Sequence, residues 1–209
     1  MSNYGLLING ELVKSDMTLD VINPATEEVF TQVPRADEAM LDQAVAGAKV
    51  AAAKWALTDI DERKALIHKI ADAINANIEP LAKALTQEQG KPLAAATMEV
   101  QYAEIFCRYF TSLNLENEVL VDDENQRVEV QRTPLGVVAG ILPWNFPLLI
   151  GIYKIAPSIL AGNSIILKPA PTTPVVSVML GEILKDVVPA GLVNILVDDN
   201  DLGPKITSH

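Results

Sequence analysis

The stretch Gly140-Ile141-Leu142-Pro143-Trp144-Asn145-Phe146-Pro147 decides the fold. It begins inside an apolar run over residues 137–142. That run stops at Pro143, because proline lacks a backbone N–H and does not continue a central strand. An apolar helical segment follows Pro147. We therefore predict that Trp144 and Asn145 lie on a short rigid turn directly after a strand.

The segments around this turn alternate between strand and helix patterns. Strands are predicted at 137–142, 164–167 and 193–197, with helices between them at 147–161 and 174–186. Such alternation forms parallel strand pairs through right-handed crossovers. The predicted fold class is therefore α/β, a Rossmann-like parallel sheet with flanking helices. Ligands of such sheets bind outside the carboxyl ends of the strands.

The first 125 residues are predicted to form short strands and then helices. Asn9-Gly10 between two apolar runs predicts a β-hairpin with a type I′ turn, and strands at 20–23 and 29–33 flank a second turn. Thr58 and Asp59 are N-cap candidates. Apolar spacings of three and four predict helices through Leu41, Ala44, Val45, Ala48, Ala52 and Trp55, and through Leu66, Ile67, Ile70, Ile74 and Ile78. A third helix is predicted to end at Gly90-Lys91-Pro92, and a fourth to cover about 93–109.

Composition and charge exclude several classes of function. The chain carries 16 Lys and Arg against 27 Asp and Glu, whereas nucleic-acid binding needs a basic face. The most apolar stretch, 148–160, is too short to span a bilayer, and no metal-ligand spacing is present. One cysteine and no recognisable signal peptide lead us to expect a cytoplasmic protein without nucleic-acid, membrane or metal partners.

Ordered motifs over most of the chain resemble the aldehyde dehydrogenase superfamily. They are the turn at 143–147, then Lys154, Gly162-Asn163 and Ile166-Leu167-Lys168-Pro169. The resemblance implies N-terminal strands and helices of the nucleotide-binding domain at 1–125, an oligomerisation arm at 126–136 and the first βαβαβ unit at 137–209. It also implies that the chain is the N-terminal part of an enzyme more than twice as long.

The resemblance implies NAD(P)+-dependent oxidation of an aldehyde to a carboxylic acid. In the family a cysteine thiolate adds to the carbonyl, hydride passes to nicotinamide, and water hydrolyses the thioester. The implied cofactor is NAD or NADP, and the implied partners are a small aldehyde and further copies in a homo-oligomer. The family's catalytic Cys and Glu have no counterpart in these residues, so we expect the chain alone to be inactive. A non-catalytic nucleotide- or partner-binding fragment and a CoA-acylating relative remain alternatives.

Asn145 is the first catalytic candidate. Its uncharged side chain has two N–H donors, which suit a developing oxyanion, and Asn is equally a preferred helix cap. The resemblance matches it to the Asn that donates its side-chain amide to the oxyanion. It also implies that the backbone of Ile141, Leu142, Pro143 and Trp144 lies along the cofactor.

Lys154 is the second catalytic candidate. It lies in a helix that is apolar on all faces, a pattern typical of a helix buried all round. Its ammonium must therefore reach water, pair with an acid or shift its pKa. The resemblance matches Lys154 to a lysine near the active site that helps a distant Glu move protons.

Lys168 ends the second parallel strand, where a lysine either faces solvent or lies at the ligand edge. The resemblance matches it to a lysine that hydrogen-bonds the adenosine ribose, within the segment Lys168, Pro169, Ala170 and Pro171. Many NAD-preferring members carry a Glu where this chain has Pro171, so the expected preference for NAD over NADP is open.

Other features point away from a site. Cys107 lies in a helix among apolar residues and is predicted to be a buried structural thiol, and His68 is predicted to lie at the surface or at the boundary of the core. Gly136 and Gly140 lack the Gly-x-Gly-x-x-Gly spacing, and the family's pyrophosphate turn is implied beyond residue 209. The alternating segment 127–132 reads as an edge strand, which the resemblance places in the oligomerisation arm.

Overall fold

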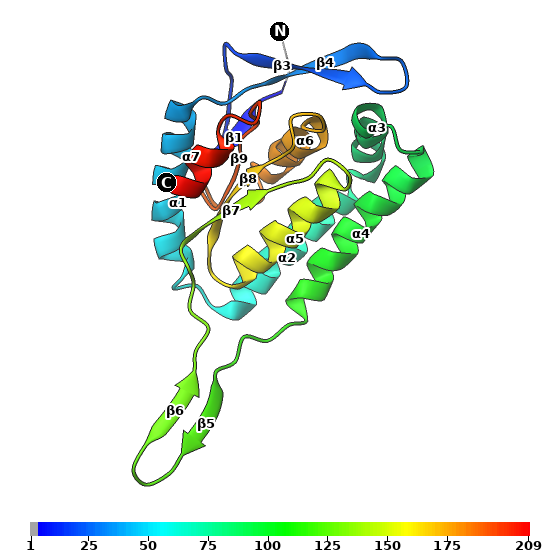
Figure 1. The fold of residues 1–209 in the computed structure, drawn as a ribbon. Helices are drawn as coiled ribbons and strands as arrows, with labels where there is room; N and C mark the ends of the chain where they lie inside the picture. Colours follow the sequence, from blue (N-terminus) through cyan, green and yellow to red (C-terminus); the bar gives the residue numbers. More distant parts are fainter. Residues whose placement is uncertain (1–3) are drawn as a thin grey trace.

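Parallel strands form the centre of the computed structural model, which describes residues 4–209 (Figure 1). β7 (Val137–Ile141), β8 (Ser164–Lys168) and β9 (Val193–Ile195) pair in parallel, in a 5-stranded sheet of order β2-β1-β9-β8-β7. β8 is buried along its whole length. The predicted α/β class and the predicted parallel strands are confirmed.

The N-terminal hairpin extends this sheet. β1 (Leu6–Ile8) pairs antiparallel with β9 through Leu7 and Ile195, and β2 (Glu11–Val13) pairs with β1. Asn9 and Gly10 have φ of 52° and 83°, as a type I′ turn requires. The predicted hairpin is therefore confirmed, whereas its place in the main sheet was not predicted.

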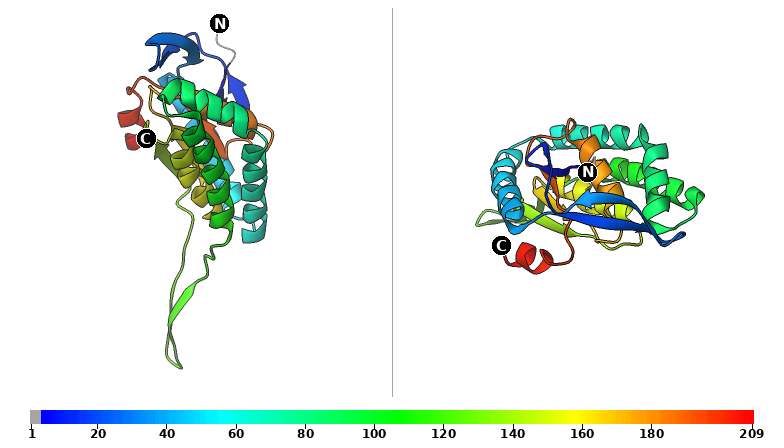
Figure 2. Two further views of the ribbon diagram at one scale, coloured as in Figure 1. Left: turned by 90° about the vertical axis from the view of Figure 1, so that its right-hand side faces the viewer. Right: turned by 90° about the horizontal axis from the view of Figure 1, so that it is seen from above.

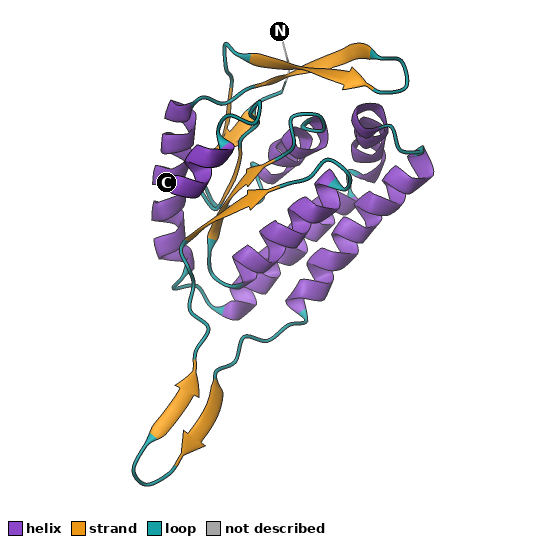
Figure 3. Cartoon of the chain, in the orientation of Figure 1, coloured by secondary structure: helices purple, strands orange, loops and turns teal. Residues whose placement is uncertain are grey.

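Helices cover both faces of the sheet (Figures 2 and 3). α1 (Glu38–Trp55) packs on one face, and α5 (Pro147–Leu160) and α6 (Val175–Leu184) pack on the other. α2 (Ile60–Asn75) and α4 (Leu93–Thr111) form a further layer against α5, and α3 (Ile78–Gln89) lies against α4 and α6. The short α7 (Gly203–Ser208) lies by β7.

Several helix boundaries differ from the predicted ones. Ile78 begins α3 and does not close the apolar stripe of α2. Asp59 occupies the N-cap position of α2, but its side chain makes no capping hydrogen bond. Gly90 ends α3 with φ of 85°, as predicted, while α6 ends earlier than predicted, at Leu184.

Two hairpins lie outside the main sheet. β3 (Thr18–Asn23) and β4 (Glu28–Pro34) cross one end of the body. β5 (Glu118–Asp122) and β6 (Arg127–Val130) form a mostly exposed arm that extends away from it (Figure 1). β5 was not predicted, so the arm begins upstream of residue 126. The acidic run Asp122-Asp123-Glu124 is typical of a solvated loop, and Asp123 and Glu124 are indeed exposed in the turn between the two strands.

Close packing of α5 on β7 depends on Gly140. A Cβ at this position would lie 2.9 Å from Leu167 Cδ1 and 3.3 Å from Lys154 Cβ. The facing side of α5 is fully buried through Ile152, Ile155 and Ile159. In residues 4–209 no helix is long and apolar enough to cross a membrane.

Candidate functional site

The segments that follow β7, β8 and β9 meet at the carboxyl edge of the sheet. They surround a cavity of about 560 Å³, within the size range of small-molecule sites. The Thr173 hydroxyl oxygen is buried there without a hydrogen-bond partner among the described residues. The cavity is lined by Trp144, Pro171, Thr172, Thr173 and Asp199 at this edge, and by Leu19, Asp20, Ile22, Pro24, Glu88 and Gln89 opposite.

The predicted turn after β7 is present, and it presents Asn145 to solvent. Leu142 is buried, whereas Trp144 and Phe146 are 59% and 45% exposed. Phe146 occupies the N-cap position of α5, and no side chain caps the helix from that position. The side-chain amide of Asn145 has no partner within residues 4–209. Helix capping therefore does not account for Asn145.

The N-terminus of α5 is capped from another helix. Glu99 of α4 is fully buried, and its Oε1 accepts hydrogen bonds from the backbone N–H groups of Leu148 and Leu149 at 3.1 and 3.2 Å. Its Oε2 pairs with Lys91, whose Nζ also donates to the Asn145 carbonyl oxygen at 2.9 Å. Sequence reasoning missed this pair, because the helices of the first half carried no recognisable motif.

Glu88 of α3 caps α6 in the same way. Its carboxyl oxygens accept from the N–H groups of Val175 at 2.6 Å and Val176 at 3.0 Å. Complete burial raises the pKa of Glu88 from 4.5 to about 8, against the two backbone donors that lower it. Buried glutamate side chains thus occupy the N-termini of α5 and α6. Neither is free for the phosphate binding that helix N-termini commonly provide.

Lys168 is buried, and its main partner is an acid. Its Nζ lies 2.5 Å from Asp198 Oδ1, with side-chain exposures of 5% and 0%. Two longer contacts reach the Pro169 carbonyl at 3.4 Å and Asn200 Oδ1 at 3.5 Å. Asp198 Oδ2 also accepts from the N–H of Leu202. Lys168 is therefore buried at the carboxyl edge of the sheet, and the idea that it is only a solvent-facing strand end is wrong.

Lys154 is exposed, which corrects the prediction of a helix buried on every side. Its α5 face, with Ile150 and Tyr153, is only partly covered. The exposed ammonium reaches water, which is the first of the three alternatives given for it above. Because Cβ of Lys154 lies over Gly140, the side chain starts directly above β7.

Asn163 of the predicted Gly162-Asn163 motif has a structural contact. Its Oδ1 accepts from the N–H of Gly136 at 2.8 Å. Gly162 has φ of +84°, as its predicted place after a helix end requires.

The predictions for Cys107 and His68 are confirmed. Cys107 is fully buried, and burial raises the pKa of its thiol to about 12. His68 is exposed on α2.

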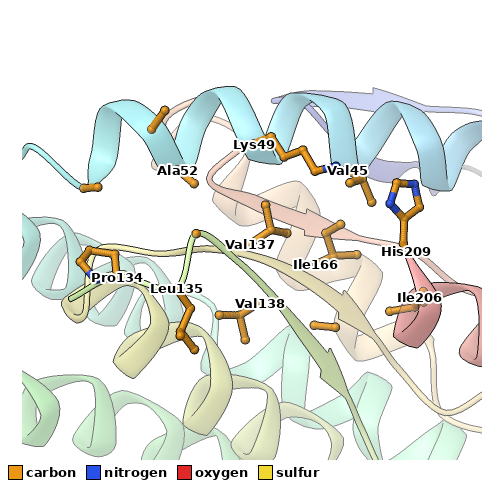
Figure 4. A pocket seen from close by; sticks show the side chains of 14 residues that line it. Val45, Lys49, Ala52, Pro134, Leu135, Val137, Val138, Ile166, Ile206 and His209 are labelled. Atoms are coloured by element: carbon orange, nitrogen blue, oxygen red, sulfur yellow. The ribbon is translucent and has the colours of Figure 1, made fainter. Parts of the chain in front are cut away.

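A second cavity, of about 550 Å³, lies away from the Asn145 turn. Figure 4 shows it between α1 and the start of β7, with Val45 and Lys49 above and Val137 and Val138 below. Leu135 on its rim is 88% exposed. It carries few polar groups, and β7 beside it has one edge without a strand partner among residues 4–209.

A family model described as the aldehyde dehydrogenase family matches residues 12–209. The chain belongs to the aldehyde dehydrogenase family. The resemblance carried by the turn at 143–147 and by Lys168 is therefore confirmed, as is the fold that it implied.

Similar proteins include enzymes from this aldehyde dehydrogenase family. The 3,6-anhydro-alpha-L-galactose dehydrogenase of Vibrio sp. (strain EJY3) is 34% identical, and the match covers 100% of this chain and 45% of that protein. An aldehyde dehydrogenase structure from Brucella melitensis biovar abortus 2308 has a TM-score of 0.93 at 34% identity, covering 100% of this chain and 44% of that one. A structure of 3,6-anhydro-L-galactose dehydrogenase in complex with NAP (NADP+) has a TM-score of 0.91 at 32% identity, covering 99% and 45%. The chain therefore spans less than half the length of these relatives.

Proposed function

We propose that this chain contributes the cofactor edge and the oxyanion donor to an enzyme that oxidises an aldehyde to a carboxylic acid with NAD+ or NADP+. The observation that carries the proposal is the exposed Asn145 turn beside a cavity at the carboxyl edge of the sheet, in a chain of the aldehyde dehydrogenase family. A small aldehyde is the proposed substrate. The cytoplasm is the proposed location.

Asn145 is proposed to stabilise the oxygen of the substrate carbonyl as negative charge develops on it. Its side-chain amide is exposed and has no partner within residues 4–209, so both N–H donors are available. A preorganised donor of this kind lowers the barrier because it needs no reorientation during the reaction. Lys154 is proposed to assist proton movement with its exposed ammonium on the neighbouring helix.

The cavity at the carboxyl edge fits part of a dinucleotide, which would supply the hydride acceptor. The unpartnered Thr173 hydroxyl offers a polar contact in it. Lys168 makes one short contact with Asp198, while its other two contacts exceed normal hydrogen-bond length. It thus retains donor capacity for a ribose hydroxyl. We place the cofactor along Ile141–Trp144 and Lys168–Pro171, and place no phosphate at the capped helix N-termini.

The 209 residues are proposed to be inactive alone, because their one thiol is buried and has a raised pKa. The purified chain is assayed with short aldehydes and both cofactors, beside Cys107→Ala and Asn145→Ala. No cofactor reduction is expected from any of the three. Reduction that Cys107→Ala abolishes would show that Cys107 is a nucleophile, and reduction that survives it would reveal another catalyst.

Cofactor choice is proposed to extend to NADP+, because Pro171 places no carboxylate where a 2′-phosphate would bind. One similar enzyme has a structure with NAP. We expect the complete enzyme to accept NADP+ at least as well as NAD+, and Pro171→Glu to weaken NADP+ binding by a few kcal/mol at most. Asp199 lines the same cavity, so Asp199→Asn is the matched control. A strong preference of the unmodified enzyme for NAD+, measured by titration, contradicts this reasoning.

A second candidate function is a non-catalytic module that binds a nucleotide or a partner. The second cavity and the open edge of β7 favour it, since uncovered apolar surface marks an interaction site. A CoA-acylating relative is the third candidate. Product analysis of the complete enzyme with and without coenzyme A separates a carboxylic acid from an acyl-CoA.

A further inference from the structure

We propose that Lys91 and Glu99 act as a positioning pair for Asn145. Lys91 lies in the corner between α3 and α4, and Glu99 lies on the buried face of α4. It rests on the proposed function, because it assigns a purpose to fixing the turn that carries Asn145. Neither residue is proposed to touch the substrate or the cofactor.

Lys91, which precedes α4, makes two contacts with the turn that carries Asn145. Its Nζ donates to the backbone carbonyl of Asn145 at 2.9 Å and lies 4.2 Å from the centre of the Phe146 ring. Both contacts favour a cation. The peptide unit that follows Asn145 is therefore held directly, and the orientation of the Asn145 side chain depends on it.

Glu99 completes the attachment on the other side of the turn. One carboxylate oxygen pairs with Lys91, and the other accepts from the N–H groups of Leu148 and Leu149. Lys91 is 10% exposed and Glu99 is 0% exposed, so the contacts are shielded from water. The turn between Pro143 and Pro147 is thus held at its carbonyl and at the helix that follows it.

The location of the pair explains why Asn145 can be exposed and still be oriented. Its side chain has no partner within residues 4–209, so its own contacts cannot fix it. Gly90, with φ of +85°, and Pro92 shape the corner that delivers Lys91 to the turn. The Lys91–Glu99 pair therefore orients the Asn145 side-chain amide by fixing the backbone of the turn. Both N–H donors of that amide stay free.

The test measures backbone order in the 209-residue chain by NMR relaxation. We expect order parameters of about 0.85 for residues 144–146, as in rigid backbone, and below about 0.6 in Lys91→Met/Glu99→Gln. The glutamine side chain introduced by Glu99→Gln keeps an acceptor oxygen for the N–H groups of Leu148 and Leu149. Because the double change also leaves no buried charge unpaired, we expect this variant to retain the fold. Lys91→Arg should keep the order of the unmodified chain.

The matched control is Lys83→Met, since Lys83 pairs with Glu79 on the exposed side of α3. It should leave residues 144–146 unchanged. Unchanged order in the Lys91→Met/Glu99→Gln variant would overturn the proposal, because Pro143 and Pro147 alone would then hold the turn. Loss of order in Lys91→Arg, which keeps the cation, would also overturn it.

A kinetic arm on the complete enzyme separates this proposal from the proposed function. Lys91→Met/Glu99→Gln should lower kcat at least about tenfold with both KM values within about threefold. Combining it with Asn145→Ala should add little to the loss from Asn145→Ala alone. If Asn145→Ala has no effect on kcat, the oxyanion role fails while the relaxation result still decides the positioning role. If Asn145→Ala slows the enzyme and the double change does not, the positioning proposal fails.

Discussion

Replacing Lys168 with methionine should destabilise the chain strongly. The change leaves Asp198 fully buried, with its Oδ1 partner at 2.5 Å removed and, among residues 4–209, only the Leu202 N–H at 2.9 Å remaining. Loss of one partner of a buried pair typically costs about 3–5 kcal/mol, because the other charge stays uncompensated. We therefore expect Lys168→Met to lower the free energy of unfolding by roughly that amount.

Urea unfolding followed by circular dichroism measures this loss. The comparison requires that the dependence of the unfolding free energy on urea concentration is the same for the variant and the unmodified chain. The matched control is Lys205→Met, because Lys205 pairs with Glu38 at an exposed surface and should cost less than about 1 kcal/mol. The double variant Lys168→Met/Asp198→Asn should be more stable than the sum of its single changes predicts, since it removes both charges. A loss below about 1 kcal/mol for Lys168→Met would refute the reasoning.

Three further outcomes follow from the structure. The pKa of Glu88 is about 8 in the folded state and 4.5 in the unfolded state, so the folded state holds this proton more tightly. The free energy of unfolding should therefore fall as pH rises between these two values. Glu88→Gln should remove most of that slope in denaturation series at several pH values. Cys107 should react with a thiol reagent only after unfolding, and fast labelling of the native chain would contradict its burial. The chain should self-associate by light scattering, and deletion of residues 118–130 should weaken that association; a clean monomer at high concentration would argue against this.

Much of the carboxyl edge could be predicted from local sequence. Pro143 and Pro147 bracket the turn, and the alternating strand and helix patterns place it and Lys168 at one edge. These signals are short-range, so they survive without knowledge of tertiary contacts. The family resemblance added roles to Asn145 and Lys154, and those roles stay predictions.

The partners of these residues could not be predicted in the same way. Glu88, Glu99 and Asp198 look like ordinary charged residues, and only the fold brings them to helix N-termini or to Lys168. The burial of the helix that carries Lys154 was misjudged because the helix is apolar by composition, whereas exposure depends on what packs against it. β5 was missed because its acidic end suggested a solvated loop.

The two buried glutamates also bear on how the chain folds. Glu88 contacts Val175 across 87 residues, and Glu99 contacts Leu148 across 49. Contacts between such distant segments form late, because closing a long loop costs entropy before the contact offsets it. We expect the helices of the first half to collapse early and the carboxyl edge of the sheet to become ordered in the last step. A pulse-labelling experiment should then find the amides of Leu148 and Val175 protected after those of α2 and α4.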